Sequence, residues 1–215
     1  MIDDYSGASY IDFGAPNESI VGTNLENVLW LPVVNNDRWW TAVLRGVYFS
    51  DAPDTKYALT ARYALTDTGT SCLIGPSSDM SALRSALVDK LSYYATWDSW
   101  GEVFYCSERD TLPTMSILYG DYWFEMRPVD YAIQIAGSGS EAVCAFCFSS
   151  ADFGYWILGA AFMRGWYVVH DHENARQGFV AIDDGYGTKS EPVEVDEYPT
   201  TTLPGGSSTG GETLD

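Results

Sequence analysis

Short runs of β-branched and aromatic residues, separated by turn-forming residues, recur along most of this chain. Such runs are typical of β-strands, because side chains that branch at Cβ or carry a ring pack well on a pleated surface. They span residues 27–34, 39–49, 57–66, 122–126, 142–148 and 165–170. The sequence therefore predicts an all-β fold with short helices.

Two segments depart from this pattern and predict helices. After the turn residues 75–78, apolar side chains recur at three- or four-residue spacing: Met80, Leu83, Leu87 and Leu91. A serine of that turn is expected to cap the first amides of this helix. A second, shorter helix is expected over residues 160–164.

Length and charge limit the class of protein further. With 215 residues, of which 46% are hydrophobic, the chain can bury a core of ordinary size. The 30 Asp and Glu against 11 Lys and Arg give a net charge of −19, which repels phosphate backbones and anionic lipids. Nucleic-acid binding is therefore not expected. No membrane span is expected either, since no stretch approaches the roughly 18 apolar residues required.

The composition changes near residue 184. Residues 185–215 are acidic, rich in Thr, Gly, Ser and Pro, and poor in apolar side chains. A segment of this kind buries too little surface to offset its ordering entropy. We expect a folded domain over residues 1–184 and a flexible tail over residues 185–215.

One acidic turn carries the clearest chemical signal. The apolar run 63–66 leads directly into Asp67-Thr68-Gly69-Thr70-Ser71. A glycine two positions after the aspartate allows a tight turn and close approach of a ligand to the backbone. The small hydroxylated residues around Gly69 can donate hydrogen bonds to the carboxylate and fix its orientation. The turn is therefore a candidate catalytic site.

A second ordered pattern follows about 90 residues later. Residues 157–159 are an apolar pair ending in glycine, and the expected short helix follows them directly. Residues 165–180 then predict a β-hairpin that turns at residues 171–175.

Together these segments resemble the C-terminal lobe of the pepsin-like aspartic proteases, the cathepsin D and pepsin family. The resemblance covers about residues 5–184 and implies a single lobe of a bilobal, β-rich fold built around a pseudo-two-fold cleft. The matching segments are residues 11–14, 39–44, 67–71, 75–76, 157–159 and 171–179.

The resemblance also implies roles for individual residues. Asp67 would be one catalytic aspartate, activating water for peptide-bond hydrolysis, and Thr68 would brace the catalytic pair. Ile157 would border a substrate pocket, and no metal or organic cofactor is implied. Ala160 departs from the family pattern, which often has Asp at this position. Further substrate-binding residues would be Thr68, Gly69, Thr70 and Ser71.

The sequence holds a single Asp-Thr-Gly. The chemistry needs two carboxylates, one ionised to accept a proton from water and one protonated to polarise the scissile carbonyl. Three explanations remain open. The chain is one part of a two-lobed protease, or it pairs with a second copy about a two-fold axis as retroviral proteases do, or it is a non-catalytic module that binds peptides or other partners.

The cysteines admit three pairings. The resemblance implies a Cys106–Cys144 disulfide, and it leaves Cys72 and Cys147 open as a second disulfide or as buried thiols. A zinc site is not expected, because the cysteines lack a second close ligand pair.

Asn17 begins an Asn-Glu-Ser glycosylation acceptor. With the disulfides, it favours the secretory route, in an acidic lumen or outside the cell. Residues 1–30 show no signal peptide. An upstream region carrying the signal and the first lobe is therefore expected.

Two other motifs predict structure rather than chemistry. His170-Asp171-His172 alternates across a strand end and is not expected to bind metal. Residues 137–140, Gly-Ser-Gly-Ser, lack the order of a nucleophile elbow and indicate a hairpin loop.

Overall fold

The computed structural model describes residues 11–34, 39–97 and 99–204, and it confirms a mostly β architecture with short helices. None of the helices in these segments combines the length and the hydropathy that crossing a membrane requires. The strands are β1 (Leu29–Pro32), β2 (Thr41–Phe49), β3 (Tyr57–Ala58), β4 (Tyr63–Thr66), β5 (Leu73–Gly75), β6 (Ala95–Trp97), β7 (Gly101–Tyr105), β8 (Met115–Tyr119), β9 (Tyr122–Met126), β10 (Ala132–Ala136), β11 (Val143–Phe146), β12 (Phe148–Ser150), β13 (Trp156–Leu158), β14 (Trp166–Asp171), β15 (Arg176–Ala181), β16 (Val193–Glu194) and β17 (Thr201–Thr202).

The helices are α1 (Glu18–Val21), α2 (Ser77–Val88), α3 (Pro128–Tyr131) and α4 (Ala160–Met163), with 3-10 turns η1 (Cys106–Thr111) and η2 (Gly139–Glu141). Both expected helices are therefore present, as α2 and α4.

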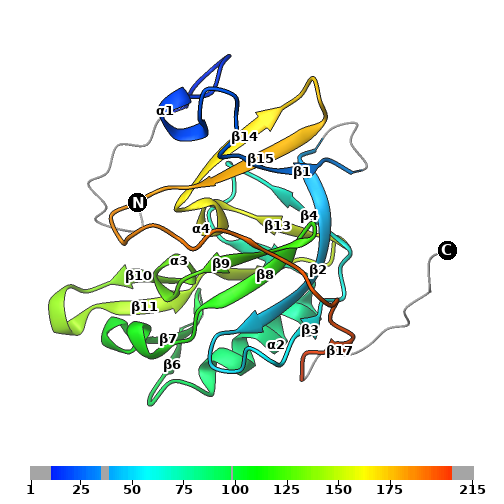
Figure 1. Ribbon diagram of the computed structural model, residues 1–215. Coiled ribbons are helices and arrows are strands. Elements are labelled where there is room, and N and C mark those ends of the chain that lie inside the picture. The colour runs from blue at the N-terminus through cyan, green and yellow to red at the C-terminus, as the bar shows by residue number, and fades with distance from the viewer. Residues whose placement is uncertain (1–10, 35–38, 98, 205–215) are drawn as a thin grey trace.

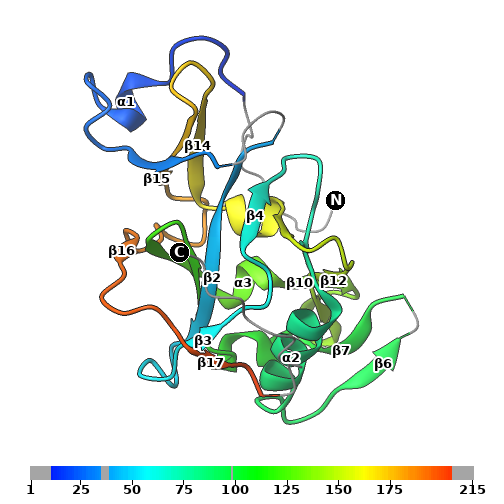
Figure 2. The same ribbon diagram turned by 90° about the vertical axis from the view of Figure 1, so that its right-hand side faces the viewer.

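The strands form three sheets (Figure 1). The largest runs in the order β12-β5-β13-β4-β2-β8-β9-β16, with β3 and β17 attached beside β2. Two smaller sheets have the orders β1-β15-β14 and β10-β11-β7-β6. The β14–β15 hairpin confirms the turn expected at residues 171–175. Figure 2 shows the β14–β15 hairpin and α1 at the end of the molecule opposite α2 and β6.

Most pairings in the large sheet are antiparallel, but β13 lies parallel to β4, with Leu158 opposite Thr66. A parallel pair needs a long crossover connection. Here the crossover contains β5 to β12, so the end of β4 is completed by a strand that lies far downstream in the sequence.

An aromatic cluster joins the β1-β15-β14 sheet to the large sheet. Phe179 of β15 packs against Phe124 with ring centroids 5.0 Å apart and against Tyr119 at 6.2 Å. Phe162 of α4 and Trp166 of β14 contact Phe124 at 5.7 and 5.4 Å. Edge-to-face and tilted contacts of this kind add to the stabilisation from burial alone.

The start of α2 differs from the expectation. Pro76 is the N-cap residue and forms no side-chain cap bond, so no serine caps this helix. Ser77 instead donates its N–H and its hydroxyl to the two carboxylate oxygens of Asp152, at 2.8 and 3.0 Å. The free amide at the helix start is therefore satisfied from a loop 75 residues away.

Residues 185–204, here called the C-terminal strap, pack on the domain, so the flexible tail expected from residue 185 is wrong for this segment. β16 pairs with β9, β17 pairs with β3, and Leu203 is buried. Strand addition satisfies backbone groups without a large apolar area. Residues 205–215 of the expected tail lie outside the described residues.

A buried ion cluster fastens the strap. The Lys189 ammonium lies 3.2 Å from an Asp130 carboxylate oxygen, and both side chains are fully buried. Arg127 pairs with Asp130 at 3.0 Å and with Asp184 at 2.6 Å. Opposite charges compensate one another in this cluster, so removing one member leaves an uncompensated buried charge.

We expect Lys189→Met to lower the free energy of unfolding by about 3–5 kcal/mol, because Asp130 loses a buried partner. Urea unfolding measures this change. Lys56→Met is the matched control, since the Lys56–Asp196 pair holds the same strap with the Asp196 side chain 79% exposed. Its cost should stay at or below about 1 kcal/mol. Equal losses in the two variants would contradict the assignment of the strap's main anchor to the cluster.

The stability of the cluster should depend on pH. Burial alone would raise the pKa of Asp184, but hydrogen bonds from Arg127 and from the Tyr186 N–H outweigh it and lower the pKa below 3.8. A carboxyl group whose folded pKa is lowered stabilises the fold above its unfolded pKa, and this contribution is lost as pH falls through the folded pKa.

Wild-type protein should therefore keep the Asp184 contribution at pH 4 and lose it at lower pH. The free energy of unfolding of Asp184→Asn, measured over the same range, should fall less steeply than that of the wild type. Parallel curves would contradict this prediction.

Candidate active site

Asp67 lies directly after β4, at the start of the acidic turn. The Gly69 N–H donates to Asp67 Oδ1 at 2.9 Å, and the Thr70 hydroxyl donates to Oδ2 at 2.6 Å. The turn closes through the Thr70 N–H, which donates to the Asp67 carbonyl at 3.2 Å. Both carboxylate oxygens are thus held by neighbouring donors, and the half-buried side chain has a fixed orientation. The Thr70 hydroxyl is a donor of the kind expected from the sequence, whereas the Gly69 N–H was not expected.

Backbone hydrogen bonds from the start of α4 hold this turn and the residue after it. The N–H groups of Gly159, Ala160 and Ala161 donate to the carbonyls of Cys72, Thr70 and Ser71, at 3.2, 2.8 and 2.9 Å respectively. A Cβ at residue 159 would collide with the carbonyl oxygens of Thr70 and Cys72. The glycine is therefore required by close backbone approach.

The other predicted site residues gather around this turn. Thr68, Gly69 and Ser71 are exposed. Ile157 is half-buried on β13, opposite Leu65 of β4. Ala160, where the resembling family often has Asp, contributes its backbone N–H to the turn.

Two disulfides are present. Cys106 pairs with Cys144, the pairing that the resemblance implies, and Cys72 pairs with Cys147. All four cysteines are thus oxidised, which excludes the zinc alternative. The Cys72–Cys147 bond, which the sequence left open, ties the residue directly after the turn to the segment between β11 and β12.

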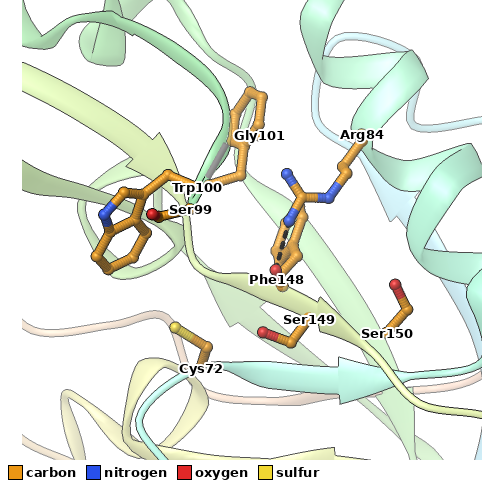
Figure 3. Close-up of a pocket in the computed structure, with 9 residues that line it drawn as sticks. Cys72, Arg84, Ser99, Trp100, Gly101, Phe148, Ser149 and Ser150 are labelled. Atoms are coloured by element: carbon orange, nitrogen blue, oxygen red, sulfur yellow. Dashed lines mark hydrogen bonds between the residues drawn. The ribbon is translucent and has the colours of Figure 1, made fainter. Parts of the chain in front are cut away.

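A surface pocket of about 280 Å³ has Cys72, the residue directly after the turn, on its wall (Figure 3). It lies between α2, the residues that join β6 to β7, and β12, which is an edge strand of the large sheet. Arg84 crosses the pocket, paired with Glu102 at 2.9 Å and donating to the Phe148 carbonyl. The sequence did not indicate this pocket, because its walls come from separate elements: Cys72, Arg84, Ser99, Trp100, Gly101, Phe146, Phe148, Ser149 and Ser150.

The two histidines flank a tryptophan. The rings of His170 and His172 lie 4.5 and 6.5 Å from the Trp40 ring, and burial lowers the pKa of His170. Asp171, between the histidines, accepts a hydrogen bond from Arg176 at 2.7 Å. These contacts give the motif a packing role.

The remaining motifs lie at chain turns. Asn17 caps α1 and is exposed, with its side-chain oxygen accepting from the Ser19 N–H at 3.0 Å. Residues 137–140 lie in the loop between β10 and β11, as expected for a hairpin loop.

Comparison with known proteins identifies the class. The model of the eukaryotic aspartyl protease family matches residues 2–182. The chain belongs to this family, and its β-rich architecture is that of a pepsin-like lobe.

Individual relatives agree with this assignment. The chain is 27% identical to cathepsin D of Dictyostelium discoideum over 161 residues, covering 74% of this chain and 40% of the relative. It is 28% identical to gastricsin of Suncus murinus, covering 81% of this chain and 42% of the relative. It is 30% identical to a vacuolar aspartic protease of Candida albicans, covering 67% and 32%. The chain thus spans about two-fifths or less of the length of these relatives.

The two disulfides allow a matched test of what holds the turn. Replacing Cys72 and Cys147 by Ala, or Cys106 and Cys144 by Ala, should each lower the free energy of unfolding by roughly 2–5 kcal/mol. Only the first pair of changes should also speed amide hydrogen exchange at Ala160 and Ala161, whose N–H groups bind the turn. Equal local exchange in the two variants would contradict a local role for Cys72–Cys147.

Proposed function

We propose that this chain acts as one lobe of an aspartic endopeptidase and supplies Asp67 as one of two catalytic carboxylates. The observation that carries the proposal is the double hydrogen bonding of the Asp67 carboxylate by Gly69 and Thr70 within a turn supported by α4. A carboxylate pre-oriented in this way needs little reorganisation when it exchanges a proton with water.

The reaction needs a second carboxylate near Asp67. The ionised member of the pair takes a proton from the attacking water, and the protonated member donates to the scissile carbonyl oxygen. The sequence holds one Asp-Thr-Gly, so the second carboxylate would come from a second lobe or from a second copy of this chain. The full lengths of the relatives, well over twice the matched span, favour the second lobe.

The residues around the turn suit an extended peptide. The backbone of Gly69 and the exposed Ser71 hydroxyl offer hydrogen-bonding groups beside Asp67. The Thr70 hydroxyl donates to Asp67, and its oxygen can still accept from a substrate N–H. Thr68 would brace the catalytic pair, and Ile157 would border a pocket for an apolar side chain.

The pocket lined by Cys72, the residue directly after the turn, offers a site for a substrate side chain. Trp100 also lines it, and its half-buried ring offers an apolar contact. We therefore assign the peptidase a preference for substrates with large apolar side chains.

The proposal also includes the cellular compartment in which the protein acts. Two disulfides and an exposed Asn17 in a glycosylation acceptor suit a protein of the secretory route, in an acidic lumen or outside the cell. One relative is named as a vacuolar protease.

The test is a peptidase assay at about pH 4 on a peptide with apolar side chains beside the scissile bond, with light scattering to measure the mass. Asp67→Asn should abolish cleavage, and a statine-type inhibitor should block the wild type. Asp110→Asn, which changes an exposed carboxylate on η1, is the matched control and should keep full activity.

The oligomeric state distinguishes the two sources of the second carboxylate. Activity of the chain as a dimer supports the symmetric arrangement, whereas activity only after an N-terminal lobe is added supports the two-lobed one. A folded chain that binds the peptide in both settings and never cleaves it would refute the protease proposal and favour a peptide-binding module.

A further inference from the structure

Three polar side chains lie together in the apolar interior below the candidate active site. Thr66, Tyr119 and Gln177 come from β4, β8 and β15, which belong to two different sheets. Gln177 and Tyr119 are completely buried, and Thr66 is 4% exposed. Burying polar groups is unfavourable unless they are hydrogen-bonded, so the partners of these three side chains decide their effect.

The three side chains form one directed chain of hydrogen bonds. The Thr66 hydroxyl donates to Gln177 Oε1 at 3.0 Å, and Gln177 Nε2 donates to the Tyr119 hydroxyl oxygen at 2.7 Å. Tyr119 then donates to the Ala64 carbonyl at 3.2 Å. Burial raises the pKa of Tyr119 far above its ordinary value, so the phenol keeps the proton that this last bond requires.

Both ends of this series of hydrogen bonds lie on β4, the strand that leads into Asp67. Thr66 is the residue directly before Asp67, and Ala64 lies two residues earlier on the same strand. The Thr66 N–H also donates to the Trp40 carbonyl at 3.1 Å, and that carbonyl lies 3.4 Å from the Tyr119 hydroxyl. The last residues of β4 before Asp67 are therefore held by several hydrogen bonds.

Gln177 is the link that closes this arrangement. Its side chain is the middle member of the hydrogen-bond network, between Thr66 and Tyr119. It lies on the central strand of the β1-β15-β14 sheet, opposite Leu31 and His170. The surrounding contacts are aromatic and apolar, including Phe179 two residues away, which packs on Tyr119. An apolar side chain of similar volume at residue 177 would fill the same space, so packing alone does not require the buried amide of Gln177.

We infer that Gln177 is a positioning residue for Asp67, acting through Thr66 and Tyr119. The inference rests on the proposed function for its catalytic consequence, but its structural part stands independently. The network fixes the end of β4, and thereby places the Asp67 carboxylate against its donors Gly69 and Thr70. Catalytic groups act efficiently only when neighbouring groups hold their geometry.

The test compares two equal changes at different places. Tyr119→Phe removes the donor at the end of the network, while Tyr131→Phe removes a buried hydroxyl that donates to the Pro113 carbonyl, outside the network. Gln177→Met breaks the middle of the network with little change in shape. Thr66→Val removes the first donor, and Thr66→Ser keeps a hydroxyl as the conservative variant.

The first readout needs no activity. Amide hydrogen exchange at Gly69 and Thr70, relative to core amides of the same variant, should rise about tenfold in Tyr119→Phe, Gln177→Met and Thr66→Val, which is the effect of losing one buried hydrogen bond. It should stay unchanged in Tyr131→Phe, and Thr66→Ser should restore it. Equal relative exchange in the two phenylalanine variants would overturn the inference.

The second readout uses the active, two-carboxylate form. The three network variants should lower kcat about tenfold and leave KM unchanged, because the chemistry is affected and the substrate surface is not. Unchanged kcat in these variants of an active enzyme would overturn the catalytic part of the inference. If no form of the protein cleaves peptides, the proposed function fails, and the exchange readout alone then decides whether the network holds the Asp67 turn.

Discussion

The parallel pairing of β4 with β13 is the interaction on which the geometry of the site depends. It brings the start of α4 beneath the Asp67 turn, where three consecutive N–H groups donate to the carbonyls of Thr70 and Ser71 in the turn and of Cys72 directly after it. The absence of a side chain at Gly159 allows this approach. The turn is therefore not a free surface loop. Its shape follows from a strand and a helix start that lie about 90 residues downstream.

Sequence reasoning predicted the parts of the site that local chemistry determines. Asp67 followed by Gly69 indicated a tight turn, and the residues after Gly159 indicated a short helix. Both patterns depend on neighbours in the chain, so they are visible without a structure. The expected helix after residue 76 was also local, because its apolar spacing is independent of the rest of the fold.

The features that sequence reasoning missed join distant residues. Asp152 satisfies the start of α2, and Gln177 meets Thr66 across 111 residues of sequence. No periodicity predicts which strand a polar side chain will face. The C-terminal strap was missed for a related reason: a segment poor in apolar residues can still dock when strand edges and a buried opposite charge, here Asp130 for Lys189, are already in place.

The long crossover between β4 and β13 has a consequence for folding. The ribosome adds Asp67 and its hydrogen-bond donors early. Ala160, Ala161 and Gln177, which support the turn and the strand before it, are added about 90 residues later or more. Contacts of such high sequence separation form slowly, because a long loop must close before they can stabilise anything. A nascent chain that ends before residue 161 therefore carries the aspartate without its support. The turn reaches its final geometry only when almost the whole domain has folded around it.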